Sequence, residues 1–433
     1  MRNRALRWLL PGLRVKRWLA LFTLGIALAA AGVVLLHSDW SRRHADIAFD
    51  IGLVLVGAVL ASLSVRQLIT SVVTVLLPEG TGEIAETYWR SRALLRGPRV
   101  VALGGGTGLP VMLRGIKQFT SNITAIVAVT DDGGSSGRLR GELGVPPPGD
   151  LRNCLLALAE TEPLMEQLFQ YRFESGEGLT GHAFGNLFLA AMTTVTGDLQ
   201  DAIRASSRVL AVRGQVLPAT DDQVTLRADL EDGRVISGES HIPEANGTIL
   251  RVALDPPDAS PTQEALRAIA EADVIVLSPG SLFTSLMPNL LVPGIADAIR
   301  RSSALRVYVQ NIMTQPGETD GMSAEEHLEA IVRHAGTGLV DCVVLNAAPL
   351  GDEVAQRYRL RRSEAVHCNE QGLAAAGYEV IALPLLAEGP YARHDSHLVA
   401  RTILSRWARA RRPEPGRLLD LLLLRENLRS DGR

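Results

Sequence analysis

The chain has few cysteines and few aromatic residues, and it lacks a large excess of charge of either sign. Its three cysteines, Cys154, Cys342 and Cys368, stand far apart with no paired spacing. This fits a reducing compartment and argues against a cysteine-based zinc site. A net charge of −3 provides no basic field for nucleic acid, and 4% aromatic residues argue against a platform for stacked bases. We therefore expect no nucleic-acid partner.

Two long apolar runs lie near the N-terminus. The first, Trp18–Leu36, is uncharged and long enough to span a bilayer. The second, Ile47–Ser64, contains Asp50, which we expect near an interface or facing the other helix, because a charge within a span is costly. The alternative is a buried helix pair of a soluble domain, but the first run shows no amphipathic period. We predict an N-terminal membrane hairpin, residues 1–78, with two transmembrane helices at about 18–36 and 47–64.

Basic residues gather on both outer flanks of the hairpin and are sparse between the two spans. The segment between the spans holds Arg42 and Arg43, whereas the flanks hold Arg2, Arg4, Arg7, Arg14, Lys16 and Arg17 on one side and Arg66, Arg90, Arg92, Arg96 and Arg99 on the other. The positive-inside rule places both ends in the cytoplasm, with a short external turn. We expect a multi-pass protein of the cell membrane whose main domain lies in the cytoplasm behind a linker, residues 79–97.

Two glycine-rich loops each follow an apolar strand-like run. The first run begins at Val100 and ends in a loop that lacks the lysine of a Walker A motif and the strict G-x-G-x-x-G register. The second run, Ala125–Thr130, ends in an acidic pair and a Gly/Ser loop. Glycine allows backbone N–H groups to converge on an anion, and a following helix N-terminus adds positive charge. A tight turn is the alternative for the first loop alone. We predict a phosphorylated, nucleotide-linked ligand at Gly104, Gly105, Gly106, Thr107, Gly108, Asp131, Asp132, Gly133, Gly134, Ser135, Ser136 and Arg138.

Further candidate ligand-binding residues follow other segment ends. Asp150 stands at an expected N-cap after a Pro-Pro-Pro-Gly sequence, which puts Arg152 and Asn153 in the first helical turn. His182 begins a segment that includes Asn186, and a structural or a catalytic role for this histidine is equally open. Small or polar residues also follow two later strands, at Gly280, Ser281 and Asn311.

Strand and helix patterns alternate over residues 98–411. This alternation predicts a three-layer α/β Rossmann-like domain with a mostly parallel sheet, preceded by the two transmembrane helices. Val224–Leu230 and Val235–Glu239 read as a small β-hairpin insertion at an edge. Residues 412–433 form a charged tail with an apolar stretch, Leu418–Leu424. The polar strand ends would meet in one crevice.

The motifs resemble those of the YvcK/CofD family of Rossmann-like proteins. The resemblance covers roughly Pro98–Leu404 and rests on GGGTG at Gly104–Gly108, DDGGSSGRLR at Asp131–Arg140, PPPGDLRN at Pro146–Asn153, HAFGNL at His182–Leu187, the segment Ala272–Ile295, and QNIMTQPGET at Gln310–Thr319. Within the family, the chain is similar to the bacterial branch called gluconeogenesis factors. That branch implies a UDP-sugar-binding regulator of cell shape and peptidoglycan synthesis during gluconeogenic growth.

Two functions remain open from the sequence. The first, which the branch resemblance favours, is a regulator without turnover, with a UDP-sugar as ligand and envelope-synthesis proteins or a second copy of the chain as partners. The second is a transferase of the 2-phospho-L-lactate type, with Mg²⁺ held by Asp131 and Asp132. The motifs show no evident nucleophile–base pair, although phosphoryl-type transfer needs mainly positioning and charge neutralisation. No further cofactor is expected.

Overall fold

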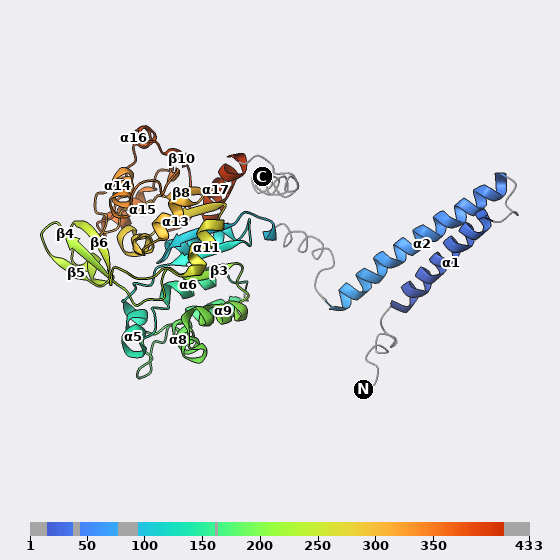
Figure 1. Ribbon diagram of the computed structural model, residues 1–433, viewed down its shortest axis with the longest axis horizontal. Coiled ribbons are helices and arrows are strands. Elements are labelled where there is room, and N and C mark those ends of the chain that lie inside the picture. The colour runs from blue at the N-terminus through green and yellow to red at the C-terminus, as the bar shows by residue number, and fades with distance from the viewer. Residues whose placement is uncertain (1–14, 38–43, 77–93, 161–162, 411–433) are drawn as a thin grey trace. The chain divides into compact units, whose positions relative to one another are not determined.

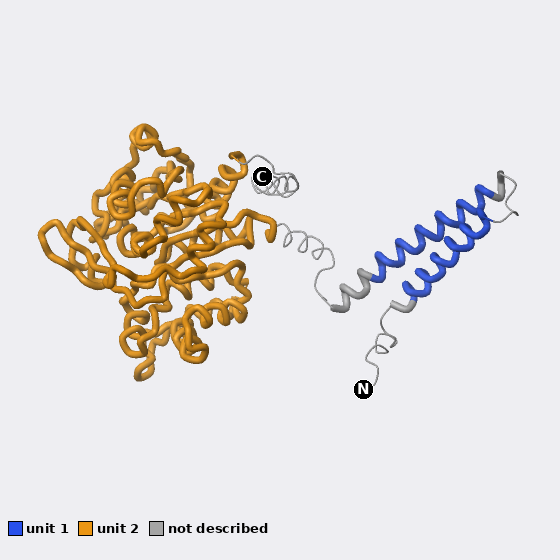
Figure 2. The backbone as a smooth tube through the Cα atoms, in the orientation of Figure 1, with its two compact units in different colours: residues 1–92 blue, residues 93–433 orange. Residues whose placement is uncertain are grey.

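A computed structural model of the chain describes residues 15–37, 44–76, 94–160 and 163–410. The chain divides into two compact units, residues 1–92 and 93–433 (Figure 2). The expected tail, residues 412–433, and most of the expected linker lie outside the described residues. Leu94, which we placed in the linker, is 3% exposed, and its carbonyl oxygen accepts the Ser121 N–H at 2.9 Å. The folded domain therefore begins by Leu94 and not at Pro98.

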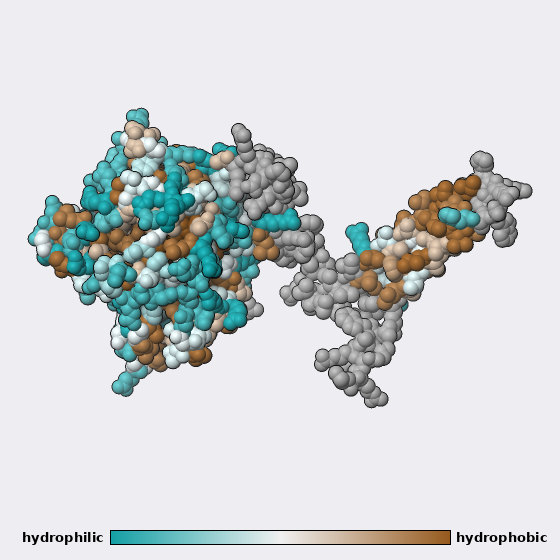
Figure 3. Space-filling model, in the orientation of Figure 1, coloured by the Kyte–Doolittle hydropathy of each residue, from teal (hydrophilic) through white to brown (hydrophobic). Residues whose placement is uncertain are grey.

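The N-terminal unit is a pair of long apolar helices, α1 (Val15–His37) and α2 (His44–Leu76), as predicted. Within them, Arg17–His37 and Ile47–Leu68 are long and apolar enough to cross a membrane, and their surface is largely hydrophobic (Figure 3). The helices pack closely because glycine leaves room for the backbone of the partner helix. A Cβ on Gly57 would lie 2.5 Å from the Ala29 nitrogen, and one on Gly25 would lie 2.7 Å from the Ala61 nitrogen.

Asp50 lies in the contact between the two helices. It is 4% exposed, and a Cβ on Gly32 of α1 would come within 2.8 Å of its carbonyl oxygen. Of the two placements expected from the sequence, the structure therefore shows the one that faces the other helix. Burial against α1 keeps the carboxylate away from the surface that lipid would contact.

The second unit is built on a seven-stranded parallel sheet in the order β10-β9-β8-β7-β1-β2-β3 (Figure 1). This confirms the predicted α/β fold, although the short strand β3 was not expected from the sequence. The strands are β1 (Val100–Gly104), β2 (Ile123–Val127), β3 (Gln215–Pro218), β7 (Val274–Leu277), β8 (Leu305–Val309), β9 (Cys342–Asn346) and β10 (Glu379–Leu383).

Both faces of the sheet are covered by helices. In β1, Val100 and Ala102 join one core cluster and Val101 and Leu103 join the other, as side chains alternate along a strand. The first cluster is covered by α4 (Gly108–Ile116), α6 (Gly149–Leu158), α9 (Leu199–Val209) and α17 (Ser396–Ala410). The second is covered by α11 (Gln263–Glu271), α12 (Met287–Leu291), α13 (Ile295–Arg301) and α14 (Ala324–Ala335).

The remaining described elements connect these layers. They are α5 (Gly134–Leu143), α7 (Pro163–Gln170), α8 (Phe184–Thr196), α10 (His241–Glu244), the π-helical turn η2 (Leu282–Leu286), α15 (Asp352–Arg359) and α16 (Glu370–Ala375). The predicted hairpin is present as β4 (Thr225–Leu230) and β5 (Val235–Ser237). It does not extend the main sheet: with β6 (Ile249–Asp255) it forms a separate antiparallel sheet, β5-β4-β6, here called the small sheet.

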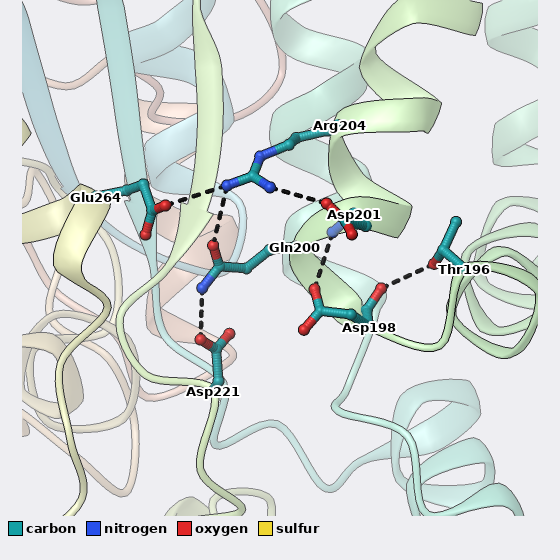
Figure 4. A network of polar contacts seen from close by, with 7 residues as sticks. All are labelled: Thr196, Asp198, Gln200, Asp201, Arg204, Asp221 and Glu264. Atoms are coloured by element: carbon teal, nitrogen blue, oxygen red, sulfur yellow. Dashed lines mark hydrogen bonds and ion pairs between the residues drawn. The ribbon is translucent and has the colours of Figure 1, made fainter.

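Polar contacts join α9 to α11 beside the edge strand β3 (Figure 4). Arg204 of α9 donates to Asp201 of its own helix at 2.8 Å and to Glu264 of α11 at 3.1 Å. Asp198 caps α9 by accepting the Asp201 N–H at 3.0 Å. These side chains are exposed, so we expect each ion pair to contribute little stability.

Candidate functional site

The order of the strands places a crevice between β1 and β7. The chain proceeds from β1 to β2 and β3 on one side, and from β7 to β8, β9 and β10 on the other. Open α/β sheets bind ligands at such a reversal, beyond the carboxyl ends of the strands. A cavity of about 780 Å³ lies there, with Thr107 and Gly108 after β1, Gly280 after β7 and Asn311 after β8 in its lining. Its volume is typical of a small-molecule site.

The cavity is strongly basic. Five arginines and no aspartate or glutamate line it, and the arginines are Arg114, Arg152, Arg172, Arg361 and Arg393. Among the described residues, only Arg114 of these five forms an ion pair, with Glu166 at 4.0 Å. The chain as a whole carries a net charge of −3, so this concentration of positive charge is local. It indicates a ligand with more than one negative charge, and guanidinium groups suit phosphate oxygens.

Arg152 has unused hydrogen-bonding capacity. It lies in the first turn of α6, where its Nη2 donates to the Asn153 side chain at 2.8 Å. Its Nε is buried and has no hydrogen-bond partner among the described residues. Burial and the neighbouring Arg172 lower the pKa of Arg152, yet a guanidinium remains protonated in proteins. Two adjacent positive groups favour an anion between them.

The first glycine-rich loop contributes to the cavity only through its end. Thr107 and Gly108 line the cavity, whereas the lining does not include Gly104, Gly105 or Gly106. Gly106 has a φ of +57°, a left-handed conformation that glycine adopts without strain. Its N–H points to Asp150 and donates to Oδ2 at 2.6 Å. The loop therefore presents the N-terminus of α4 to the cavity and its glycine backbone to the protein interior.

Asp150 does not cap α6 as predicted. The N-cap is Pro148, and Asp150 is the second residue of the helix. The predicted N-cap is wrong because α6 begins two residues earlier than expected, directly after the proline run. Burial, followed by the charge of Asp131, raises the pKa of Asp150 to about 6 although the Gly106 N–H opposes the shift.

Two glutamates that the sequence did not indicate lie in this region: Glu239 is near Asp150 and Asp131, and Glu318 is near Glu239. Burial and these neighbouring carboxylates raise the pKa of Glu239 to about 8. Burial raises the pKa of Glu318 to about 7, and Glu318 Oε1 accepts the Thr284 hydroxyl at 3.1 Å. No sequence spacing links these glutamates to the glycine-rich loops. Asp150 thus has acidic neighbours as well as Arg152, whereas the lining of the cavity contains no acidic side chain.

The two aspartates after β2 accept hydrogen bonds from backbone amides. Asp131 Oδ1 accepts the Gly133 N–H at 3.0 Å, and Asp132 Oδ1 accepts the Ser240 N–H at 2.9 Å, next to the small sheet. Among the described residues, no three histidine, cysteine or acidic side chains gather closely enough to hold a metal ion. Mg²⁺ is usually held by one or two carboxylates together with substrate phosphates and water, so Asp131 and Asp132 stay the predicted ligands of the transferase alternative.

We expect Asp132→Ala to loosen the small sheet by removing the acceptor for the Ser240 amide. An unpaired, partly buried amide costs about 1–2 kcal/mol, so proteolytic cleavage within residues 225–255 should accelerate about 5- to 30-fold. Asp132→Asn retains an acceptor and should change the rate less. The control is Asp232→Ala, an exposed aspartate bonded to Arg234 in its own turn. Equal acceleration in both alanine variants would contradict this role.

Several other residues predicted from the second loop and from the His182 segment form hydrogen bonds within the protein. Ser135 Oγ lies 3.0 Å from His182 Nδ1 and accepts from Asn186 Nδ2 at 3.1 Å, and all three side chains are buried. The group fastens α5 to the start of α8, which favours the structural role of His182. Arg138 donates to the Thr180 carbonyl. The lining of the cavity includes none of these, nor Gly133, Gly134 or Ser136.

The later predicted residues lie at the cavity or next to it. Asn311 Oδ1 accepts the Gly280 N–H at 2.8 Å, and Asn311 Nδ2 donates to the Gly280 carbonyl at 2.7 Å. Ser281 donates to Gln315. The lining therefore includes six predicted residues, Thr107, Gly108, Arg152, Asn153, Gly280 and Asn311. Sequence reasoning missed Arg114, Arg172, Arg361 and Arg393, because these come from four separate segments with no shared motif.

Comparisons with known proteins agree with this architecture. Residues 100–386 match the family described as 2-phospho-L-lactate transferase CofD. The gluconeogenesis factor of Halalkalibacterium halodurans is 53% identical over 306 residues, which are 70% of this chain and 95% of that one. The gluconeogenesis factor of Bacillus subtilis is 49% identical and covers 71% of this chain and 97% of its own.

A longer relative also matches the N-terminal unit. The putative gluconeogenesis factor of a Nostoc species is 45% identical over 93% of this chain and 92% of its own, so the match reaches into residues 1–92. Among solved structures, the crystal structure of a Bacillus halodurans protein superimposes with a TM-score of 0.70 and is 52% identical. It covers 71% of this chain and 99% of that protein.

Proposed function

Because the chain belongs to the YvcK/CofD family, alongside the gluconeogenesis factors, we propose that it binds a UDP-sugar and regulates cell-envelope synthesis. The observation that carries the proposal is the cavity at the β1–β7 reversal, with its arginines and without acidic side chains. A diphosphate would lie between the N-terminus of α4 and Arg152, where backbone dipoles and guanidinium groups both favour negative charge. The volume of about 780 Å³ accommodates a nucleotide with an attached sugar.

We favour binding without turnover. A regulator needs a ligand-dependent surface and no reacting group, and no side chain in the cavity forms a nucleophile–base pair with another. The transferase alternative draws on the description of the matching family. Asp131, Asp132 and Asp150 each accept a backbone amide, and a role in holding the loops explains these contacts without a metal.

Calorimetry on the full chain in detergent tests the proposal. We expect UDP-glucose to bind without Mg²⁺, and UMP to bind more weakly because it lacks one phosphate. Incubation with UDP-glucose, or with a guanine-nucleotide conjugate of phospholactate and Mg²⁺, should leave the nucleotide unchanged by chromatography. Absence of UDP-sugar binding would contradict the ligand class, and conversion of the conjugate in the presence of an acceptor would favour the transferase.

The two long apolar helices support a membrane hairpin, which would hold the proposed regulator beside the membrane steps of envelope synthesis. We propose envelope-synthesis proteins as its partners. We also predict that the chain can form a homodimer. The orientation rests on the basic flanks of the hairpin, which favour a cytoplasmic location for both termini.

Cysteine labelling tests this orientation. A cysteine introduced as Ser38→Cys, in the expected external turn, should react with a membrane-impermeant maleimide on intact cells. A cysteine at the exposed position Glu353 of α15 should react only after the cells are permeabilised. Labelling of Glu353→Cys in intact cells would show that the domain faces outward and that the positive-inside argument is wrong.

A further inference from the structure

Asp150 lies directly against the backbone of the glycine-rich loop. Its Oδ2 accepts the Gly106 N–H at 2.6 Å, and a Cβ on Gly105 would come within 2.6 Å of the same oxygen. The Gly106 N–H, which the sequence predicted as a donor to an external anion, therefore donates to a carboxylate of the protein itself. The next two residues of the loop, Thr107 and Gly108, still face the cavity.

Charges of both signs surround Asp150. Arg152 on its own helix favours the charged carboxylate, whereas Asp131 after β2 and Glu239 beside the small sheet disfavour it. Burial is the largest of these influences. The carboxylate thus persists beside a cavity for anions, where its charge repels a bound phosphate.

We propose that Asp150 is a positioning residue with two separable effects on the ligand site. Its carboxyl oxygen holds the glycine-rich loop so that Thr107 and Gly108 face the cavity, while its negative charge lowers the affinity for an anionic ligand. The second effect rests on the proposed function. A neutral group with an acceptor oxygen in the same place keeps the loop in position without the repulsion, so Asn and Ala at this position act in opposite directions.

Calorimetry with UDP-glucose on the full chain in detergent measures both effects. At about pH 7.5 we expect Asp150→Asn to bind about 3- to 10-fold more tightly than the natural chain. Asp150→Ala also removes the repulsion, but the Gly106 amide then loses its acceptor and the loop is displaced; we expect this loss to outweigh the gain and to weaken binding about 10-fold. The matched control is Asp297→Asn, an exposed aspartate in the first turn of α13, which should leave binding unchanged.

The pH dependence separates charge from structure. As the pH falls from about 7.5 to 5.5, Asp150 takes up a proton near its pKa of about 6, so binding of the doubly charged ligand should strengthen. Glu239 and Glu318 also gain protons in this range, whereas burial lowers the pKa of His394 to about 4 and keeps it neutral. Asp150→Asn should therefore show a shallower pH profile than the natural chain.

Hydrogen exchange provides a readout that does not depend on the ligand. The peptide containing Gly106 should exchange at least about 10-fold faster in Asp150→Ala and remain protected in Asp150→Asn. Fast exchange in both variants would overturn the positioning role. If UDP-glucose binds the natural chain and Asp150→Asn loses affinity as much as Asp150→Ala, Asp150 contacts the ligand and the inference fails while the proposed function stands. If UDP-glucose does not bind the natural chain, the proposed function and the charge effect both fail, and exchange alone decides the positioning role.

Discussion

Replacing Arg152 with glutamine should weaken UDP-glucose binding by about 10- to 100-fold, as measured by calorimetry on the full chain in detergent. Hydrogen bonds between charged groups contribute about 1.5–3 kcal/mol each. Arg152 lines the cavity, and among the described residues its guanidinium makes one side-chain hydrogen bond, to Asn153, so further N–H donors are available to a ligand. Because Arg152 forms no ion pair with a described residue, the substitution should leave the fold intact.

The control for this prediction is Arg208→Gln. Arg208 is exposed on α9 and does not line the basic cavity. The Arg208→Gln substitution removes the same charge from the domain without changing a residue that lines the cavity. If both variants lose affinity equally, the effect comes from net charge alone and the cavity is not the phosphate site.

Replacing Gly108 with alanine should cost about 3 kcal/mol or more and lower the melting temperature of the domain by at least about 6 °C. A Cβ at this position would lie 1.8 Å from the carbonyl oxygen of Pro279. That atom belongs to the backbone after β7, so relief requires the loops after β1 and β7 to separate. Because both loops line the cavity, ligand binding should be lost as well. Differential scanning fluorimetry and calorimetry measure the two effects.

A second glycine supplies the matched control. Gly141 lies within α5, and a Cβ there would have nothing within 4 Å. Alanine in an exposed helix interior is more favourable than glycine by up to about 1 kcal/mol, so Gly141→Ala should keep or slightly raise the melting temperature. An unchanged melting temperature in Gly108→Ala would show that the two loops do not touch as described.

The sequence predicted the layers of the domain because its strongest signals are local. Buried strands such as Val274–Leu277 are uniformly apolar, and helices such as Ala324–Ala335 have a capping box. A few consecutive residues are therefore enough to predict each element. The edge strand Gln215–Pro218 escaped prediction because it is short and ends in proline. The small sheet was read as an edge hairpin because pairing partners are not encoded locally.

The candidate site was predicted where strand ends and the first turn of α6 determine it. Thr107, Gly280 and Asn311 follow parallel strands, whose carboxyl ends meet at one edge of the sheet. The arginines of the cavity come from helices and turns far apart in the sequence, so only the folded chain brings them together. Ser135 and His182, which the sequence also predicts as site residues, bond to each other in the interior, and their role at a ligand site stays a prediction. A sequence motif does not show whether its polar side chains bind a ligand or bind other groups of the protein.

The most direct test of the central claim is a structure of the chain with UDP-glucose, determined by crystallography or electron microscopy. The account predicts that the diphosphate lies in the basic cavity, within hydrogen-bonding distance of the Arg152 guanidinium and the N-terminal amides of α4. The sugar and uridine should extend along the carboxyl ends of β7 and β8. A ligand located elsewhere on the domain, such as the groove beside Gln200 and Arg204, would contradict the account.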